Sequence, residues 1–147
     1  MFRIFLFLLA AVFPLSLLTG CEEENYAEED CYDYDYSDCN TIEPLESTLR
    51  IKLTINGQNP EVEIVVFNGK AEAKDTFSVT TVTDPVFYQT VPLNAYYSAS
   101  ATYNVDGKTI IATDGDRISS TSSVVCDSTC WSISGGYIDI RLKYDNF

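Results

Sequence analysis

Hydrophobic residues recur at every second position through most of the chain that follows residue 49. Apolar and polar side chains alternate in residues 49–55, again in residues 62–66, and again in residues 138–142. This period of two is typical of a strand with one buried face, and residues 49–147 lack the i, i+3, i+4, i+7 spacing of an amphipathic helix. The pattern predicts a fold built from β-strands.

Turn signals divide this region into short segments. The pairs that break the alternation are Asn56-Gly57, Asn68-Gly69, Asp84-Pro85, Asp106-Gly107 and Asp114-Gly115. Asp106-Gly107 predicts a tight hairpin, and Asp114-Gly115 predicts a further turn. We therefore expect residues 49–147 to form one all-β domain, an antiparallel β-sandwich of about seven strands with an Ig-like or transthyretin-like arrangement.

One segment narrows the class of sandwich. Residues 91–101 read VPLNAYYSASA, a proline-containing turn that leads into a tyrosine-bearing strand. The segment resembles one found in transthyretin-like and carboxypeptidase-regulatory-like domains, although the glycine common there is Asn94 or Ala95 here. The resemblance implies a seven-stranded sandwich of the kind used as an accessory or adhesive module.

The first twenty residues have the features of a signal peptide. Arg3 precedes an uncharged apolar run that is shorter than a spanning helix requires and contains Pro14. The following residues, Leu18-Thr19-Gly20-Cys21, resemble a bacterial lipobox. The resemblance implies that Cys21 carries a diacylglyceryl group and becomes the first residue of the mature protein. The acyl chains of this diacylglycerol and an added palmitate would then attach the protein to a membrane.

Acidic residues dominate the segment after Cys21. Residues 21–48 contain eleven acidic and no basic side chains, whereas residues 49–147 contain eleven acidic and eight basic ones. Most of the net charge of −13 therefore belongs to a predicted tether at residues 21–48. Glu22-Glu23-Glu24 resembles the surface-export signal of Bacteroidota-type lipoproteins, which implies an outer-membrane protein exposed at the cell surface; the periplasmic face is the alternative.

Four further cysteines, Cys31, Cys39, Cys126 and Cys130, are expected to form disulfides in an exported chain. Local pairs, Cys31 with Cys39 and Cys126 with Cys130, need no docking of the acidic segment and are the favoured prediction. The alternative crosses these pairs and closes a loop of about 90 residues, which stabilises the fold more in the chain-entropy model.

The candidate ligand sites are weak. Asp33 and Asp35 begin a calcium-loop pattern that lacks its glycine and its final glutamate, and Asp114 and Asp116 flank the glycine of a predicted turn. Three aromatic residues could stack on a sugar or contact a partner protein: Tyr88, Tyr96 and Trp131.

Composition also excludes several functions. The sequence contains no histidine, so Ser–His and Cys–His catalysis and histidine-ligated metals are excluded. The acidic balance argues against nucleic acid as a partner. We expect a non-enzymatic binding or assembly module without a cofactor, whose partner is the membrane through its lipid and an unidentified protein or glycan. A carbohydrate- or calcium-binding module is the alternative, and a hydrolase using Asp114 and Asp116 is disfavoured.

Overall fold

The computed structural model describes residue 31 and residues 35–143. The chain divides into two units, residues 1–34 and residues 35–147, and the second unit contains the fold. The predicted signal peptide at residues 1–20, the predicted lipid-attachment site Cys21 and the calcium candidate Asp33 lie outside the described residues.

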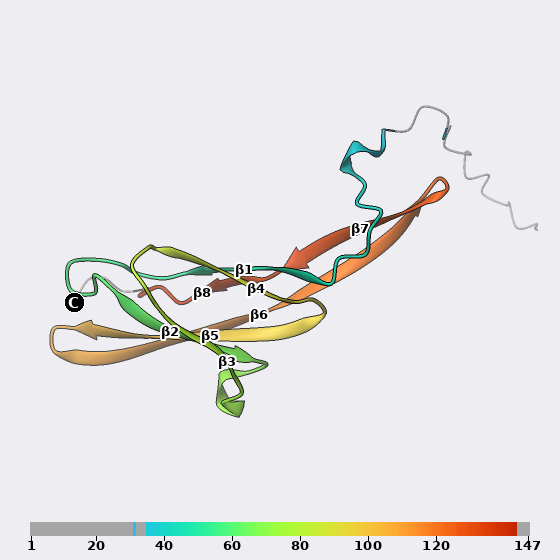
Figure 1. The fold of residues 1–147 in the computed structure, drawn as a ribbon. Helices are drawn as coiled ribbons and strands as arrows, with labels where there is room; N and C mark the ends of the chain where they lie inside the picture. The colour runs from blue at the N-terminus through green and yellow to red at the C-terminus, as the bar shows by residue number, and fades with distance from the viewer. Residues whose placement is uncertain (1–30, 32–34, 144–147) are drawn as a thin grey trace, which may run out of the picture. The chain divides into compact units, whose positions relative to one another are not determined.

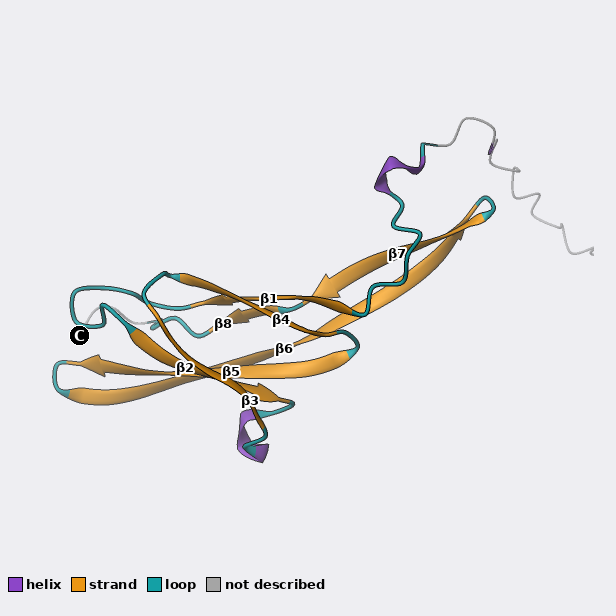
Figure 2. Ribbon diagram, viewed as in Figure 1, coloured by secondary structure: helices purple, strands orange, loops and turns teal. Residues whose placement is uncertain are grey.

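The second unit is all-β, as predicted, with eight strands in two sheets (Figures 1 and 2). The smaller sheet has the order β4-β1-β8, with bounds Val86–Pro92, Glu46–Lys52 and Tyr137–Asp139. The larger sheet has the order β3-β2-β5-β6-β7, with bounds Thr76–Val82, Val62–Asn68, Ala95–Val105, Lys108–Val125 and Ser128–Gly135. Short 3₁₀ turns occupy η2 (Tyr36–Asp38) and η3 (Ala71–Ala73). Within the described part of the chain, no helix is long and apolar enough to cross a membrane.

Most strand pairs are antiparallel, but β8 runs parallel to β1. Ile51 faces Ile138 across this pair, and Arg50 faces Tyr137. The parallel pair modifies the expected antiparallel sandwich. After β7 the chain leaves the large sheet and enters the small sheet next to β1, where it runs in the same direction as β1.

The core forms where the alternating apolar faces of the two sheets meet. It contains Leu49, Ile51, Leu53, Val62, Ile64, Val66, Val82, Val91, Tyr97, Ala99, Ala101, Tyr103, Ile118, Ile138 and Ile140. Tyr103 joins the two sheets, since its hydroxyl donates to the Ile140 carbonyl at 2.9 Å and accepts from the Thr54 amide at 3.2 Å. Burial raises the pKa of Tyr103 above its ordinary value.

The predicted hairpin at Asp106-Gly107 is confirmed. Both residues have positive φ, 50° and 78°, and Val105 pairs with Lys108 on either side of them. These angles are characteristic of the two-residue turn whose twist matches that of the flanking strands. At the β4–β5 turn, Asn94 adopts φ 63°, a left-handed conformation that asparagine tolerates better than most residues.

The turn predicted at Asp114-Gly115 is wrong, because β6 continues through it as one strand of 18 residues. Gly115 pairs with Ser98 of β5. A β-carbon at Gly115 would lie 2.8 Å from the Tyr97 carbonyl oxygen, so the glycine permits close packing here rather than a change of direction.

The outer halves of β6 and β7 form a two-stranded ribbon. β5 pairs with β6 only as far as Ile118, whereas β6 and β7 remain paired from Ile118 and Gly135 to Val125 and Ser128. The ribbon extends beyond the ends of the other strands (Figure 1). A ribbon of this kind has little stability on its own.

The chain passes from one sheet to the other at Gly135-Gly136, where φ is 78° and 80°. The Gly136 amide donates to the Arg117 carbonyl in the large sheet at 3.2 Å. The Gly136 carbonyl accepts from the Arg50 amide in the small sheet at 2.8 Å. A β-carbon at Gly135 would collide with the Arg117 carbonyl oxygen.

We therefore predict that Gly135→Ala lowers the free energy of unfolding by at least about 2 kcal/mol, from left-handed strain and the collision with Arg117. Urea denaturation measures the effect. Gly57→Ala is the matched control, because nothing lies within 4 Å of a β-carbon there. Equal stability of the two variants would contradict this account of the crossing.

Candidate functional site

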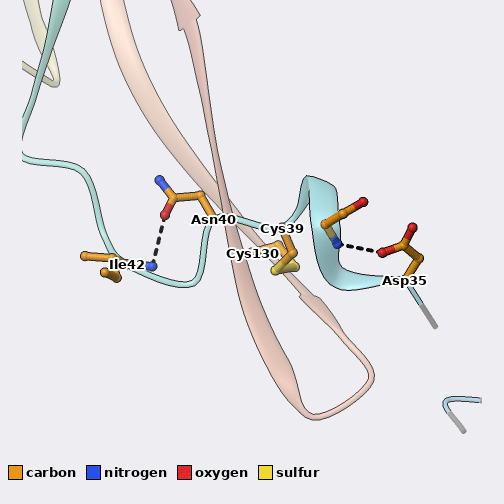
Figure 3. The surroundings of a disulfide bond; sticks show 6 residues. Asp35, Cys39, Asn40, Ile42 and Cys130 are labelled. Atoms are coloured by element: carbon orange, nitrogen blue, oxygen red, sulfur yellow. Dashed lines mark hydrogen bonds between the residues drawn. A yellow bond between two sulfur atoms is a disulfide. The ribbon is translucent and has the colours of Figure 1, made fainter. Parts of the chain in front are cut away.

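A disulfide joins Cys39, within the acidic segment, to the ribbon (Figure 3). Cys39 and Cys130 are bonded with an S–S distance of 2.03 Å across 91 residues of sequence. The Trp131 amide donates to the Asn40 carbonyl at 2.8 Å, so the chain beside Cys39 lies against β7. Cys31 and Cys126 are also disulfide-bonded.

The favoured local pairing of Cys31 with Cys39 and of Cys126 with Cys130 is therefore wrong. Cys130 lies within β7, where its partner across the ribbon is Ser123, while Cys126 lies in the turn. The docked segment brings Cys39 next to β7, and the Cα atoms of Cys39 and Cys130 are 4.9 Å apart. The short sequence separations favoured the local pairs, but the backbone contact between Asn40 and Trp131 places Cys39 beside Cys130 instead.

Asp35, one of the weak calcium candidates, has a local structural role. Its Oδ1 accepts from the Ser37 amide at 2.9 Å and caps η2, as Figure 3 shows. This backbone hydrogen bond lowers the pKa of Asp35. In the described part of the chain, no three His, Cys, Asp or Glu side chains are grouped closely enough to hold a metal ion.

Asp114 and Asp116 bind the backbone of β8. Their carboxylates accept from the Asp139 amide at 2.8 Å and from the Tyr137 amide at 2.9 Å. The second oxygen of Asp116 accepts from the Arg117 amide at 2.8 Å. The two carboxylates, which we call the carboxylate clamp, supply acceptors to the edge of β8 that faces away from β1.

Asp139 and Arg141 form a two-bond ion pair beside the clamp. The Arg141 Nε and Nη2 atoms donate to the two Asp139 carboxylate oxygens at 2.8 and 2.7 Å. The Arg141 hydrogen bonds lower the pKa of Asp139 to about 2, against burial, which acts to raise it. Asp139 is therefore ionised at neutral pH, and its charge is balanced by its neighbour.

A groove of about 300 Å³ lies beside these residues. Its charged lining comes from Asp114, Asp139, Arg141 and Lys143, and Ile110 and Leu142 are among its apolar lining residues. This volume is at the small end of ligand-binding cavities. The two acidic groups that line it are already hydrogen-bonded, to the Asp139 amide and to Arg141 respectively.

The outward face of the small sheet carries a row of large side chains. Arg50 of β1 pairs with Tyr88 of β4 on one side and with Tyr137 of β8 on the other. Lys52 lies two residues along β1, and its Nζ is 5.2 Å from the centre of the Tyr137 ring. We call Tyr88, Arg50, Tyr137 and Lys52 the aromatic–basic face.

The three aromatic residues that the sequence singled out lie on different strands. Tyr88 is on β4 of the small sheet, whereas Tyr96 is on β5 and Trp131 on β7 of the large sheet. The sequence analysis missed Arg50, Tyr137, Asp139 and Arg141 as site residues. Arg50, Asp139 and Arg141 stand at polar positions of the alternation in residues 49–55 and 138–142, but this pattern does not show which strands are adjacent, and Tyr137 lies outside it.

Comparison with known proteins adds no relative. No protein-family model, no curated protein and no solved structure matches the chain.

The disulfide assignment predicts a specific peptide map. Cleavage of the unreduced protein before aspartate residues separates Cys126 from Cys130 at Asp127, and should release a linked peptide pair containing Cys39 and Cys130. A map that joins Cys126 to Cys130 would contradict the structure. Because the loop spans 91 residues, full reduction should lower the free energy of unfolding by at least about 4 kcal/mol in the chain-entropy model.

The carboxylate clamp predicts a graded loss of stability. Asp116→Ala removes the acceptors of the Tyr137 and Arg117 amides and should lower the free energy of unfolding by about 1–2 kcal/mol. Asp116→Asn keeps one carbonyl acceptor and should cost less. Asp127→Ala, in the exposed ribbon turn, is the control and should change stability by under about 0.5 kcal/mol in urea denaturation. Equal losses in Asp116→Ala and Asp127→Ala would rule out the clamp.

Proposed function

We propose that this chain is a lipid-anchored cell-envelope protein whose β-sandwich is a non-enzymatic binding module. The observation that carries the proposal is the disulfide between Cys39 and Cys130. Disulfides persist in the oxidising compartments outside the cytoplasm. A disulfide-bonded domain that follows a signal-peptide-like segment and the Leu18–Cys21 lipobox pattern supports export and lipidation of Cys21.

The disulfide limits the length of chain between Cys21 and the domain. Cys39, which is bonded to the ribbon, lies 18 residues after Cys21 in the sequence. Fully extended, that length of chain would span at most about 65 Å, so it limits the distance between the lipid and the ribbon. Glu22-Glu23-Glu24 supports the cell surface as the location, with the periplasmic face as the alternative.

A non-enzymatic role is supported by what the candidate catalytic carboxylates do. Asp114 and Asp116 are engaged with backbone amides of β8, so they contribute to the fold rather than forming an acid–base pair around a substrate. The likeness of residues 91–101 to transthyretin-like and carboxypeptidase-regulatory-like domains supports an accessory or adhesive role of the same kind.

A second candidate function is carbohydrate binding. It is favoured by Tyr88, which is 60% exposed on the outer face of the small sheet. Exposed aromatic rings of this kind offer a surface on which a sugar ring can stack. A calcium-binding role has less support, since Asp35 caps η2 and Asp114 and Asp116 hold β8.

The anchoring proposal predicts the behaviour of Cys21→Ser. Without the thiol no diacylglyceryl group can attach, so the variant should lose incorporation of radiolabelled palmitate and leave the outer-membrane fraction. Cys126→Ser is the matched control, because it also removes one sulfur but leaves Cys21 in place, and it should keep both properties. Palmitate labelling and outer-membrane recovery of Cys21→Ser at the level of the unaltered protein would refute the anchor.

A further inference from the structure

The aromatic–basic face is arranged in register across three strands. Tyr88, Arg50 and Tyr137 occupy one row on β4, β1 and β8, so the two tyrosines flank the arginine. Since neighbouring strands are about 4.8 Å apart, the two tyrosine positions are separated by roughly 10 Å. This spacing is comparable to the length of a disaccharide.

The face is accessible and has polar neighbours. Tyr88 is 60% exposed and Tyr137 is 41% exposed. The next row of the sheet pairs two exposed threonines, Thr48 and Thr90. Aromatic rings beside hydroxyl groups on a flat sheet can both stack on a sugar and hydrogen-bond to it.

The face is also a basic region on an acidic protein. Arg50 and Lys52 project from the same side of β1, and Asp139, the acidic residue paired with Lys52, is already neutralised by Arg141. At physiological salt the Debye length is about 8 Å, so a ligand at this face responds mainly to these nearby charges.

The cations and Tyr137 are already organised around one another. The Arg50 guanidinium carbon is 6.0 Å from the centre of the Tyr137 ring, and the Lys52 Nζ is 5.2 Å from it. Cation–π contacts at these distances favour a defined position for the ring and keep both positive charges beside it. Less ordering of side chains is then needed when a ligand binds.

The geometry points to the aromatic–basic face as a binding site for an acidic polysaccharide, whose sugar rings stack on Tyr88 and Tyr137 and whose carboxylate or sulfate groups pair with Arg50 and Lys52. This inference rests on the proposed role of the domain as a binding module, and it supplies the ligand class. A membrane surface fits less well. Peripheral membrane binding requires apolar side chains that enter the lipid, whereas the residues beside this row are mostly polar: Thr48, Thr90, Lys52 and Asp139, with Val86 as the aliphatic one.

The test uses the full-length protein, purified in detergent, and immobilised polygalacturonate at about 0.15 M salt. We expect the unaltered protein to be retained, and to be retained much less by the methyl-esterified polymer, which has the same backbone without its charges. Arg50→Gln and Tyr88→Ala should each weaken binding about fivefold, the value of one exposed contact. Lys70→Gln and Tyr96→Ala, which alter a β2–β3 loop cation and a large-sheet aromatic, are matched controls and should leave binding unchanged.

Three results would overturn the inference. The first is a lack of retention of the unaltered protein on both polygalacturonate and heparin. The second is an equal loss of binding in the control variants. The third is binding to vesicles of phosphatidylglycerol and phosphatidylcholine without binding to either polysaccharide, which would assign the face to a lipid surface. Failure of the anchoring proposal is distinguishable, because it would appear as unchanged fractionation of Cys21→Ser, whereas retention on polygalacturonate does not depend on Cys21.

Discussion

The carboxylate clamp holds in place the shortest strand of the sandwich. β8 has three residues and pairs with β1 along one edge only, so it has few ladder hydrogen bonds of its own. Asp114 and Asp116 of β6 supply acceptors to its other edge. These hydrogen bonds give the two amides on that edge of β8 acceptors from the other sheet, and so they tie the short strand to β6. Ile138 is then buried in the core, and Tyr137 and Asp139 face outward.

The strands and their buried faces were predictable because they depend on local chemistry. The alternation of residues 49–55 and 138–142 identified Leu49, Ile51 and Ile138 as core residues. Asp106-Gly107 is a turn because both positions need positive φ and the strands on either side are long enough to pair. Asp114-Gly115 has the same sequence signal and is not a turn. There the glycine is required by the nearby Tyr97 carbonyl, and the aspartate by an amide of β8, both far away in sequence.

The candidate site was less predictable, because its residues become neighbours only through contacts between segments that are distant in the sequence. The row of Tyr88, Arg50 and Tyr137 depends on the order of β4, β1 and β8, which no local pattern encodes. The disulfide between Cys39 and Cys130 depends on a backbone contact between Asn40 and Trp131. The sequence shows which residue types can pair, and the strand order determines which of these residues become neighbours.

Most of the acidic residues and the cations of the aromatic–basic face lie in different parts of the chain. Nine of the eleven acidic residues in residues 21–48 precede Cys39, whereas Arg50 and Lys52 lie on the outer face of the small sheet. The bond between Cys39 and Cys130 fixes the chain that follows these nine residues to a ribbon that extends beyond the other strands (Figure 1). Glu46 is an exception, since it lies on β1 four residues before Arg50 and on the same exposed side of the strand, so the basic face has one acidic neighbour from this segment.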